Sequence, residues 1–442
     1  MKIAQVAPLW ESVPPVLHGG TERVVSFITE ELVRQGHEVT LFASGDSTTR
    51  ARLVAMCPEA LRLSKVITNY DAPLVAMLER AFTQAGEFDI IHSHLEFLPF
   101  PLARRCPIPV VTTLHARLDL PELLPLFRKF ADLPVVSISN AQRDPMPWAN
   151  WQATVHHGLP QDLYSFHPDP GKYLVFLGRI APEKGLDQAI EIAKRVEMPL
   201  RIGAKIDPAN LEYYRAVIEP LLDHPLIEYV GEVTDMEKDD FLGEAYAQLC
   251  PSDWPEPFGL VFIESLACGT PVIAYRRGSL PEIIDHGVTG FTCETLEEMI
   301  QSVRHVSVVD RKACRRAFDK RFTTQRMVKD YLKVYAAITW HTRSSSAGPF
   351  RSRFRYTLTL RSFQMGKSQE SPPPTWGNMK YKGQALREPA LCGTHKATSY
   401  RLLLGLPPSN PGAFPGGNPL VPLGPPPPTV SSPIEPVASG PF

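Results

Sequence analysis

The sequence predicts an α/β protein with two Rossmann-like parallel-sheet domains that face a cleft, followed by a disordered C-terminal tail. Short β-branched runs alternate with helical stretches twice, once before residue 160 and again after residue 170. The chain of 442 residues, 43% of them apolar, is long enough for two globular domains. Two such halves joined by one connection predict an interdomain cleft, where ligands commonly bind.

The first domain is expected to span residues 1–160. Its predicted strands are the runs KIAQVA, HEVTLFA, FDIIHSH, VVTTLH and LPVVSIS. The stretch GGTERVVSFITEELVRQG places Val24, Ile28 and Leu32 at a spacing of four residues, which is typical of one helix face. Gly36, the last residue of this stretch, is expected to stop the helix.

The second domain is expected to span residues 170–322, with predicted strands YLVFLGRI, LRIGAKI, LIEYVGEV, AQLCPS and PVIAYRR. The segment 323–340 is predicted to form a helix that docks back on the first domain. Its apolar stripe consists of Met327, Tyr331, Val334, Tyr335 and Ile338.

The composition changes abruptly after residue 340. Residues 341–442 hold 18 of the 45 prolines, eleven Lys or Arg, three Glu and no Asp, so we expect a disordered tail. It is interpreted as an out-of-frame or fused extension, with a proline-rich ligand for a partner domain as the alternative. The first 340 residues carry 35 Lys and Arg against 44 Asp and Glu, which argues against nucleic acid as a partner.

Several features predict a cytoplasmic protein. The start MKIAQVAPLWES has no signal-peptide cleavage pattern, and no stretch approaches about 20 uninterrupted apolar residues. The seven cysteines are scattered without metal-ligand spacing. The segment PELLPLFRKFADL, residues 121–133, is amphipathic. It either packs on its own domain or places the protein peripherally on the inner membrane face, if the acceptor is a lipid.

The most informative stretch is EPFGLVFIESLACGTPVIA, residues 256–274. Glu264 lies four residues after Leu260 and therefore beside the apolar face of a predicted helix. Its carboxylate either forms a salt bridge or accepts hydrogen bonds from a vicinal diol, such as a ribose presents. Gly259 favours the second interpretation, because glycine at a helix N-terminus lets backbone N–H groups approach a phosphate closely.

Two further stretches predict anion-binding turns at the cleft. FLGRIAPEKG offers Arg179 and Lys184 at the end of a strand, which suits a diphosphate, although each could be an ordinary surface charge. LHGGTERVV places Gly19 and Gly20 directly before the first helix. No G-x-G-x-x-G follows the first strand, which argues against an NAD-dependent oxidoreductase.

These three stretches, in this order, resemble the retaining glycosyltransferases of family 4, which have the GT-B fold. The likeness covers residues 1–339, and GSLPEII and GVTGF also fit it. The resemblance implies that Glu264 holds the donor ribose and that Glu256 contacts the transferred sugar. It also implies that the diphosphate is bound by four groups, namely the side chains of Arg179 and Lys184 and the backbone amides of Gly259 and Leu260.

In the first domain, the resemblance implies that Gly19 and Gly20 approach the donor phosphates. His115 in VVTTLHARLD matches the active-site histidine of the family, although a lone histidine at a strand end is more often structural. His92 and His94 in IIHSHLE are similar to a family feature near the acceptor site.

The resemblance implies a hexosyltransferase that uses a UDP-, GDP- or ADP-hexose as substrate and needs neither a cofactor nor a metal. We expect front-face transfer with retention, to a carbohydrate, lipid or small-molecule acceptor. A nucleotide-sugar epimerase and a catalytically silent nucleotide-sugar binder are the alternatives. One departure is His157, which stands where the family often has asparagine, so a role for that asparagine does not carry over.

Overall fold

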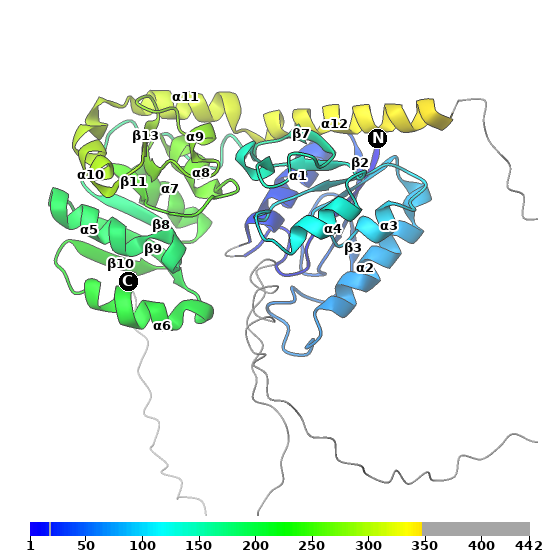
Figure 1. Ribbon diagram of the computed structural model, residues 1–442, viewed down its shortest axis with the longest axis horizontal. Coiled ribbons are helices and arrows are strands. Elements are labelled where there is room, and N and C mark those ends of the chain that lie inside the picture. The colour runs from blue at the N-terminus through cyan, green and yellow to red at the C-terminus, as the bar shows by residue number, and fades with distance from the viewer. Residues whose placement is uncertain (17–18, 347–442) are drawn as a thin grey trace, which may run out of the picture.

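The computed structural model describes residues 1–16 and 19–346, and it contains two lobes, each built on one parallel sheet (Figure 1). The α/β class and the two-domain architecture expected from the sequence are confirmed. The predicted tail begins at residue 341, but helix α12 continues to Ser346. Residues 347–442, on which the rest of that prediction falls, lie outside the described residues.

The first sheet has seven strands in the order β3-β2-β1-β4-β5-β6-β7, and neighbouring strands pair in parallel. The strands are β1 (Lys2–Val6), β2 (Glu38–Ala43), β3 (Arg52–Ala55), β4 (Ile90–Ser93), β5 (Val110–Thr113), β6 (Val135–Ser137) and β7 (Trp151–Thr154). The helices of this domain are α1 (Gly20–Arg34), α2 (Asp71–Thr83), α3 (Phe100–Ala103) and α4 (Leu123–Lys129).

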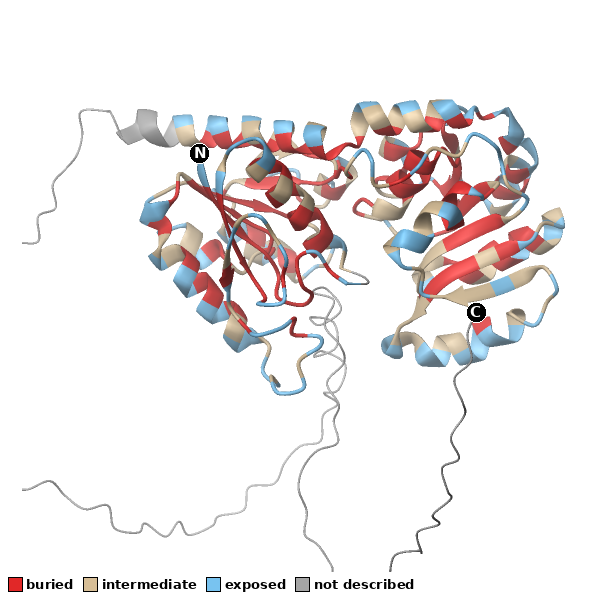
Figure 2. Cartoon of the chain, turned by 180° about the vertical axis from the view of Figure 1, so that it is seen from behind, coloured by how far each residue is buried: buried red, intermediate tan, exposed pale blue. Residues whose placement is uncertain are grey.

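The second sheet has six parallel strands in the order β10-β9-β8-β11-β12-β13. They are β8 (Leu174–Ile180), β9 (Leu200–Ile206), β10 (Ile227–Gly231), β11 (Ala247–Cys250), β12 (Val272–Tyr275) and β13 (Gly290–Cys293). Its helices are α5 (Leu186–Val196), α6 (Leu211–Tyr213), α7 (Asp235–Gly243), α8 (Leu260–Cys268), α9 (Leu280–Ile283), α10 (Leu296–His305) and α11 (Arg311–Arg321). In Figure 2 the strands of both sheets are largely buried, as parallel sheets covered by helices must be.

Three strands were not predicted from the sequence: β3, β7 and β13. Each has only four residues and lies at the end of its sheet. A strand that pairs on one side needs no continuous apolar run, so such short segments give no periodic signal.

Helix α12 (Thr324–Ser346) leaves the second domain and runs along the first (Figure 1). Met327, Tyr331 and Tyr335 are fully buried, and they belong to one hydrophobic cluster with Ile28 and Leu32 of α1. The apolar stripe read from the sequence therefore covers the first domain rather than the second. Because this contact removes large side chains from water, it stabilises the packing of α12 against α1, two helices that are far apart in the sequence.

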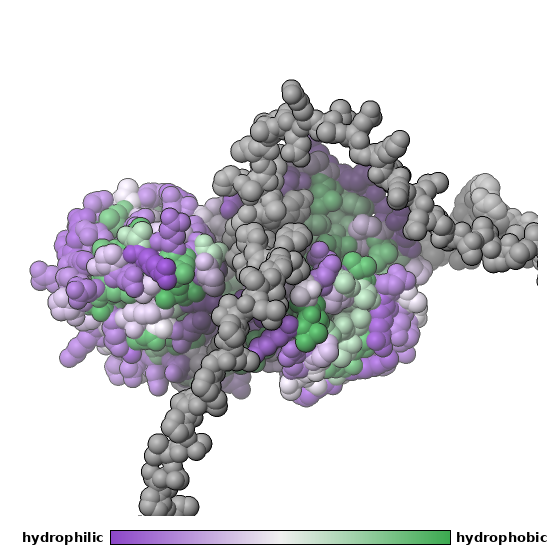
Figure 3. Space-filling view, turned by 90° about the horizontal axis from the view of Figure 1, so that it is seen from below, coloured by the Kyte–Doolittle hydropathy of each residue, from purple (hydrophilic) through white to green (hydrophobic). Residues whose placement is uncertain are grey.

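The amphipathic segment around α4 packs on its own domain. Leu123 and Phe127 are buried, and Leu124 and Phe130 lie against the same cluster. Among the described helices, none has the length and apolar content needed to cross a membrane. Figure 3 views the side opposite α12 and shows mostly hydrophilic residues on the visible surface of the second domain, with more hydrophobic residues on the first.

Candidate active site

A cavity of about 880 Å3 lies between the two domains, at the carboxyl ends of their parallel strands. It brings together all nine site residues predicted from the sequence, namely Gly19, Gly20, His115, Arg179, Lys184, Glu256, Gly259, Leu260 and Glu264. A Cβ atom placed on Gly20 would lie 3.8 Å from Cδ1 of Leu260. The N-termini of α1 and α8 therefore meet across the interdomain cleft.

Helix α8 begins at a glycine because its backbone turns sharply there. Gly259 has φ +88°, and a Cβ atom on it would lie 2.3 Å from the ring of Phe262. No side chain caps this end of the helix, so its first N–H groups are available to a ligand in the cavity. The N-terminus of α1 has the same character, since Gly19 has φ +148° and provides no side-chain cap.

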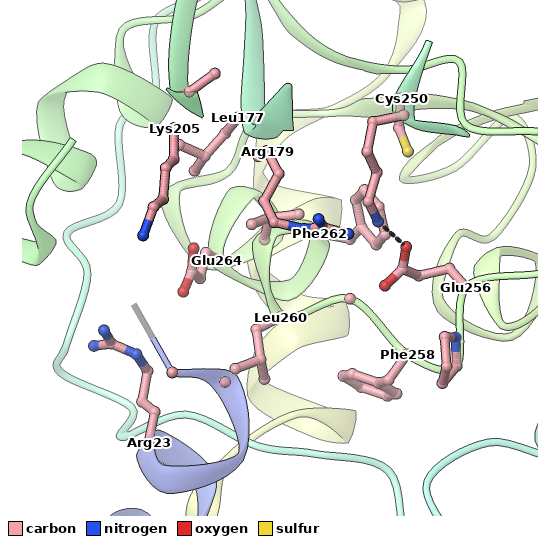
Figure 4. A pocket seen from close by; sticks show the side chains of 18 of the residues that line it. Arg23, Leu177, Arg179, Lys205, Cys250, Glu256, Phe258, Leu260, Phe262 and Glu264 are labelled. Atoms are coloured by element: carbon pink, nitrogen blue, oxygen red, sulfur yellow. Dashed lines mark hydrogen bonds and ion pairs between the residues drawn. The ribbon is translucent and has the colours of Figure 1, made fainter. Parts of the chain in front are cut away.

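Glu264 is almost completely buried, with 1% of its surface exposed. Its Oε1 atom accepts a hydrogen bond of 3.2 Å from Nζ of Lys238, which is also 3.3 Å from Asp235. Its Oε2 atom is buried and has no hydrogen-bond partner among the described residues. In Figure 4 the carboxylate points into the cavity on the side of Lys205 and Arg23. The salt bridge weighed from the sequence exists, yet it uses only one of the two oxygens.

Glu256 enters the cavity from the opposite side (Figure 4). Its Oε2 atom accepts hydrogen bonds from Lys184 and from the indole N–H of Trp254, the latter at 2.7 Å. Burial by itself would raise the pKa of this carboxyl. Lys184, Trp254 and Arg179 stabilise the anion more strongly, and the pKa lies below its ordinary value. Glu256 is therefore ionised at neutral pH, and within residues 1–16 and 19–346 its hydrogen-bond donors all contact Oε2.

The two cations predicted to bind a diphosphate both contact carboxylates in this structure. Arg179 lies 3.3 Å from Asp207 and 3.2 Å from Glu183, while Lys184 pairs with Glu256. They line the cavity as expected, but the sequence did not reveal these partners. Because each pair is partly exposed, the cations remain within reach of an anion that enters the cavity.

Four histidines of the first domain lie close together, and we call them the cleft histidines: His92, His94, His115 and His157. Three of them are buried, whereas His115 is partly exposed. His115 lines the cavity and stacks on His157 with ring centroids 5.3 Å apart. Burial lowers the pKa of His115 to about 3 and that of His157 well below its usual value. Both rings are neutral at pH 7 and act through hydrogen bonds rather than charge.

A strained residue holds the loop that carries His115. Glu96 adopts φ +50°, and its Oε1 atom accepts hydrogen bonds from the backbone N–H groups of His115 at 2.7 Å and Ala116 at 3.1 Å. Burial raises the pKa of Glu96 to about 7. Left-handed backbone at a residue other than glycine is costly and is usually retained at functional sites. Glu96 was not predicted as a site residue, because nothing in HSHLEF signals its backbone conformation.

Trp254 was also missed, although it lies two residues before the motif that begins at Glu256. The guanidinium of Arg117 lies 5.2 Å from the indole ring and Nζ of Lys184 lies 5.0 Å from it. Arg117 belongs to the first domain, so this cation–π contact crosses the cleft. A second crossing contact joins Arg23 of α1 to Asp235 of α7. An aromatic residue beside a glycine-rich motif was the available signal for Trp254.

Two protein-family profiles match this chain and show which family it belongs to. The profile described as Glycosyl transferases group 1 matches residues 165–308, and the profile described as Glycosyltransferase Family 4 matches residues 18–151. The chain belongs to glycosyltransferase family 4. The two matches correspond to the two lobes of this glycosyltransferase and together cover more than half of its length. The family resemblance read from the sequence is thus confirmed.

Named relatives and solved structures agree with this assignment. A 41.2 kDa protein of the cps region of Klebsiella pneumoniae is 28% identical over 168 residues, 37% of this chain and 45% of that relative. The D-inositol 3-phosphate glycosyltransferase of Rhodococcus erythropolis is 26% identical over 413 residues, covering 77% of this chain and 92% of the relative. The Anabaena protein HepE, solved with UDP and glucose, has a TM-score of 0.58 at 18% identity, over 76% of this chain and all of that one. The glycosyltransferase therefore has the GT-B fold.

Proposed function

We propose that this glycosyltransferase moves a hexosyl group from a nucleoside-diphosphate sugar to a hydroxyl-bearing acceptor, with retention of configuration and without a metal ion. The observation that carries the proposal is the buried Oε2 atom of Glu264, an unpaired acceptor inside a cavity that also contains two uncapped helix N-termini. A ribose diol and a diphosphate together satisfy both features. An unpaired buried carboxylate oxygen is costly unless a ligand supplies its hydrogen bonds.

The diphosphate is expected at the N-terminus of α8. Free N–H groups and the positive end of the helix dipole attract anions there. Arg179, Lys184 and Lys205 line the same cavity. Positive groups fixed before the reaction stabilise the charge that develops on the departing diphosphate, which is why we expect no need for a divalent ion.

The transferred sugar is expected between Glu256 and His115. Oε1 of Glu256 has no partner among the described residues and can accept a sugar hydroxyl, while Lys184 and Trp254 hold Oε2. We assign Glu256 this orienting role and not that of a nucleophile, because its negative charge is already stabilised by Lys184. The acceptor hydroxyl would then attack from the face that the diphosphate leaves. The anomeric configuration is retained on this path.

The acceptor is expected to enter along the first domain. That wall of the cavity contains Arg62, Arg117, His115 and His157, together with the apolar side chain of Leu120. HepE was solved with UDP and glucose, which supports a nucleotide sugar as the ligand of the opposite wall. These features support a polar acceptor and leave its class open among carbohydrates, lipids and small molecules.

A ligand screen followed by a product assay tests the proposal. UDP-, GDP- and ADP-hexoses are added one at a time, and the matching donor should raise the melting temperature in proportion to the logarithm of its concentration. The stabilising donor is then incubated with a panel of acceptors, and NMR of the product reports the anomeric configuration.

Each alternative has its own outcome in this experiment. A sugar that changes configuration in the absence of an acceptor would reveal an epimerase. Saturable donor binding without hydrolysis or transfer would reveal a silent binder. If no nucleotide sugar shifts the melting temperature, the proposed donor site is wrong.

A further inference from the structure

A continuous set of buried hydrogen bonds connects His115 at the cavity with helix α12. Nε2 of His115 lies 2.9 Å from Nδ1 of His94, and Nε2 of His94 lies 2.9 Å from Oε1 of Gln5. The Gln5 amide donates to the phenol oxygen of Tyr335 at 3.3 Å. Gln5, His94 and Tyr335 are each at most 1% exposed. The active-site histidine is thus linked to a residue 220 positions later in the chain.

The same tyrosine begins a second branch. The Tyr335 hydroxyl lies 2.7 Å from Nδ1 of His92, whose Nε2 lies 2.7 Å from Oγ1 of Thr113. Thr113 in turn donates to the hydroxyl of Tyr331 at 3.1 Å. Tyr331 therefore hydrogen-bonds only at the far end of this branch, although its ring also packs on that of His92 with centroids 4.9 Å apart. Tyr335 hydrogen-bonds to both Gln5 and His92.

These contacts determine which ring nitrogens carry hydrogen. An amide oxygen only accepts, so the bond to Gln5 requires a hydrogen on Nε2 of His94. Burial lowers the pKa of His94 well below its usual value, so this ring is neutral and its Nδ1 must accept. Nε2 of His115 then donates to it, which leaves Nδ1 of His115 as an acceptor. That atom is buried and has no partner among the described residues.

We propose that Tyr335 is a positioning residue for glycosyl transfer, which fixes the His115 tautomer so that Nδ1 accepts a hydroxyl hydrogen from the bound sugar. Because Thr113 donates to Tyr331, it accepts from Nε2 of His92, and Nδ1 of this neutral ring accepts the Tyr335 hydroxyl hydrogen. The Tyr335 oxygen can therefore only accept the Gln5 N–H, which keeps the amide oxygen facing His94. Without the phenol, the Gln5 amide has no acceptor on that side and can rotate, which would present N–H to His94 and reverse both histidine tautomers. This inference rests on the proposed transfer reaction for its kinetic consequence, but the tautomer itself does not depend on it.

Helix α12 supports the same corner of the site by another route. Arg326 donates to the carbonyl oxygens of His156 at 2.7 Å and His157 at 2.9 Å, which holds the ring that stacks on His115. No residue of α12 lies among those that line the cavity in the described part of the chain. The helix therefore acts on the site through the cleft histidines and not through contact with a ligand.

The test compares Tyr335→Phe with Tyr331→Phe in the full chain. Both replace a fully buried tyrosine of α12, but only the first removes the Gln5 contact. We expect Tyr335→Phe to lower kcat by about 3-fold to 10-fold, the range that one neutral hydrogen bond supports. The donor KM should change by less than about 2-fold, because the donor-binding groups are untouched. Tyr331→Phe should leave kcat within about 2-fold of wild type.

A double-mutant cycle separates positioning from general damage. In the His115→Ala background, Tyr335→Phe should cause no further loss of kcat, because its effect acts through the imidazole. An equal loss in both backgrounds would overturn the proposal.

Histidine-selective 15N NMR reads the tautomers without any substrate. In the wild type, His115 should carry hydrogen on Nε2, and Tyr335→Phe should give a mixture or the opposite tautomer. A wild-type His115 protonated on Nδ1, or a spectrum unchanged in Tyr335→Phe, would refute the inference even if transfer activity is established. If no donor supports transfer, the proposed function fails, and the NMR result still decides the role of Tyr335.

Discussion

Replacement of Glu264 by glutamine tests the donor site most directly. The substitution keeps the size of the side chain and an oxygen that can face Nζ of Lys238, now 3.2 Å from Oε1. It replaces the unpaired buried Oε2 by an N–H2 group, which cannot accept a hydrogen bond from a ribose hydroxyl. The change therefore removes the proposed ligand contact and the negative charge, but it keeps a hydrogen-bond acceptor for Lys238.

The expected size follows from the number of lost contacts. One or two hydrogen bonds to a charged group contribute about 1.5–3 kcal/mol, which corresponds to a donor KM raised roughly 10-fold to 100-fold. The kcat should stay within about 3-fold of wild type, because the ribose is held alike in the ground and transition states. Stability without ligand should change by less than about 2 kcal/mol, since one unpaired polar atom replaces another.

The assay measures kcat and donor KM together with the donor-induced shift in melting temperature. Glu191→Gln on α5 is the matched control, because it removes the same charge from an exposed position outside the cavity. Lys238→Met is the complementary variant, and it should destabilise the fold by about 3–5 kcal/mol by leaving a buried carboxylate without its cation. A donor KM for Glu264→Gln that equals wild type would show that Glu264 serves only the ion pair with Lys238.

Four further predictions concern catalysis, metal dependence, pH and the tail. Glu256→Gln should lower kcat by about 100-fold with a smaller change in donor KM, because the sugar it contacts changes charge and shape during reaction. Turnover should persist in EDTA, because Arg179 and Lys184 with two helix N-termini stabilise the diphosphate. Between pH 6.5 and 5.5 the free energy of unfolding should fall by about 2 kcal/mol, measured by urea denaturation. The pKa of each cleft histidine is lowered by burial, to about 3 for two of them, so the unfolded chain binds more protons as the pH falls below 6.5. Glu22 and Glu96 oppose this trend because burial raises the pKa of each to about 7, but four histidines outweigh two carboxyls. Removal of residues 347–442 should leave the melting temperature and donor binding unchanged, because the described contacts of α12 with the first domain lie before that point.

A specific experimental result would contradict each of these four predictions. Loss of transfer in EDTA that manganese restores would show that the reaction depends on a metal. A kcat of Glu256→Gln near wild type would remove that residue from the sugar site. Stability that is flat or rises between pH 6.5 and 5.5 would mean that the histidines are not neutral in the native state, and Glu96→Gln should steepen the expected fall. A large drop in melting temperature on truncation would give the tail a structural role.

Most of the fold followed from local patterns. The runs that became β1, β2, β4, β5 and β6 are rich in β-branched residues, and the first helix has its apolar side chains at the expected spacing. These patterns can be recognised in the sequence because each element buries one face or both faces in a core, which requires apolar residues at regular spacing. The edge strands β3, β7 and β13 lacked them, and the end of α12 was placed six residues too early.

The sequence by itself determined the two-sheet architecture, the family and nine of the residues that line the cavity. Glycine turns and charged residues at strand ends are local features, so their place in the fold can be recognised from the sequence. Only the tertiary structure decided their partners. Lys184 meets Glu256, Lys238 meets Glu264, and Tyr335 reaches His94 through Gln5. These residues are between 26 and 330 positions apart, and spacing along a chain carries no information about which distant side chains share a buried space. Which side chains donate and which accept hydrogen bonds in the cleft therefore depends on how the two domains and α12 pack together.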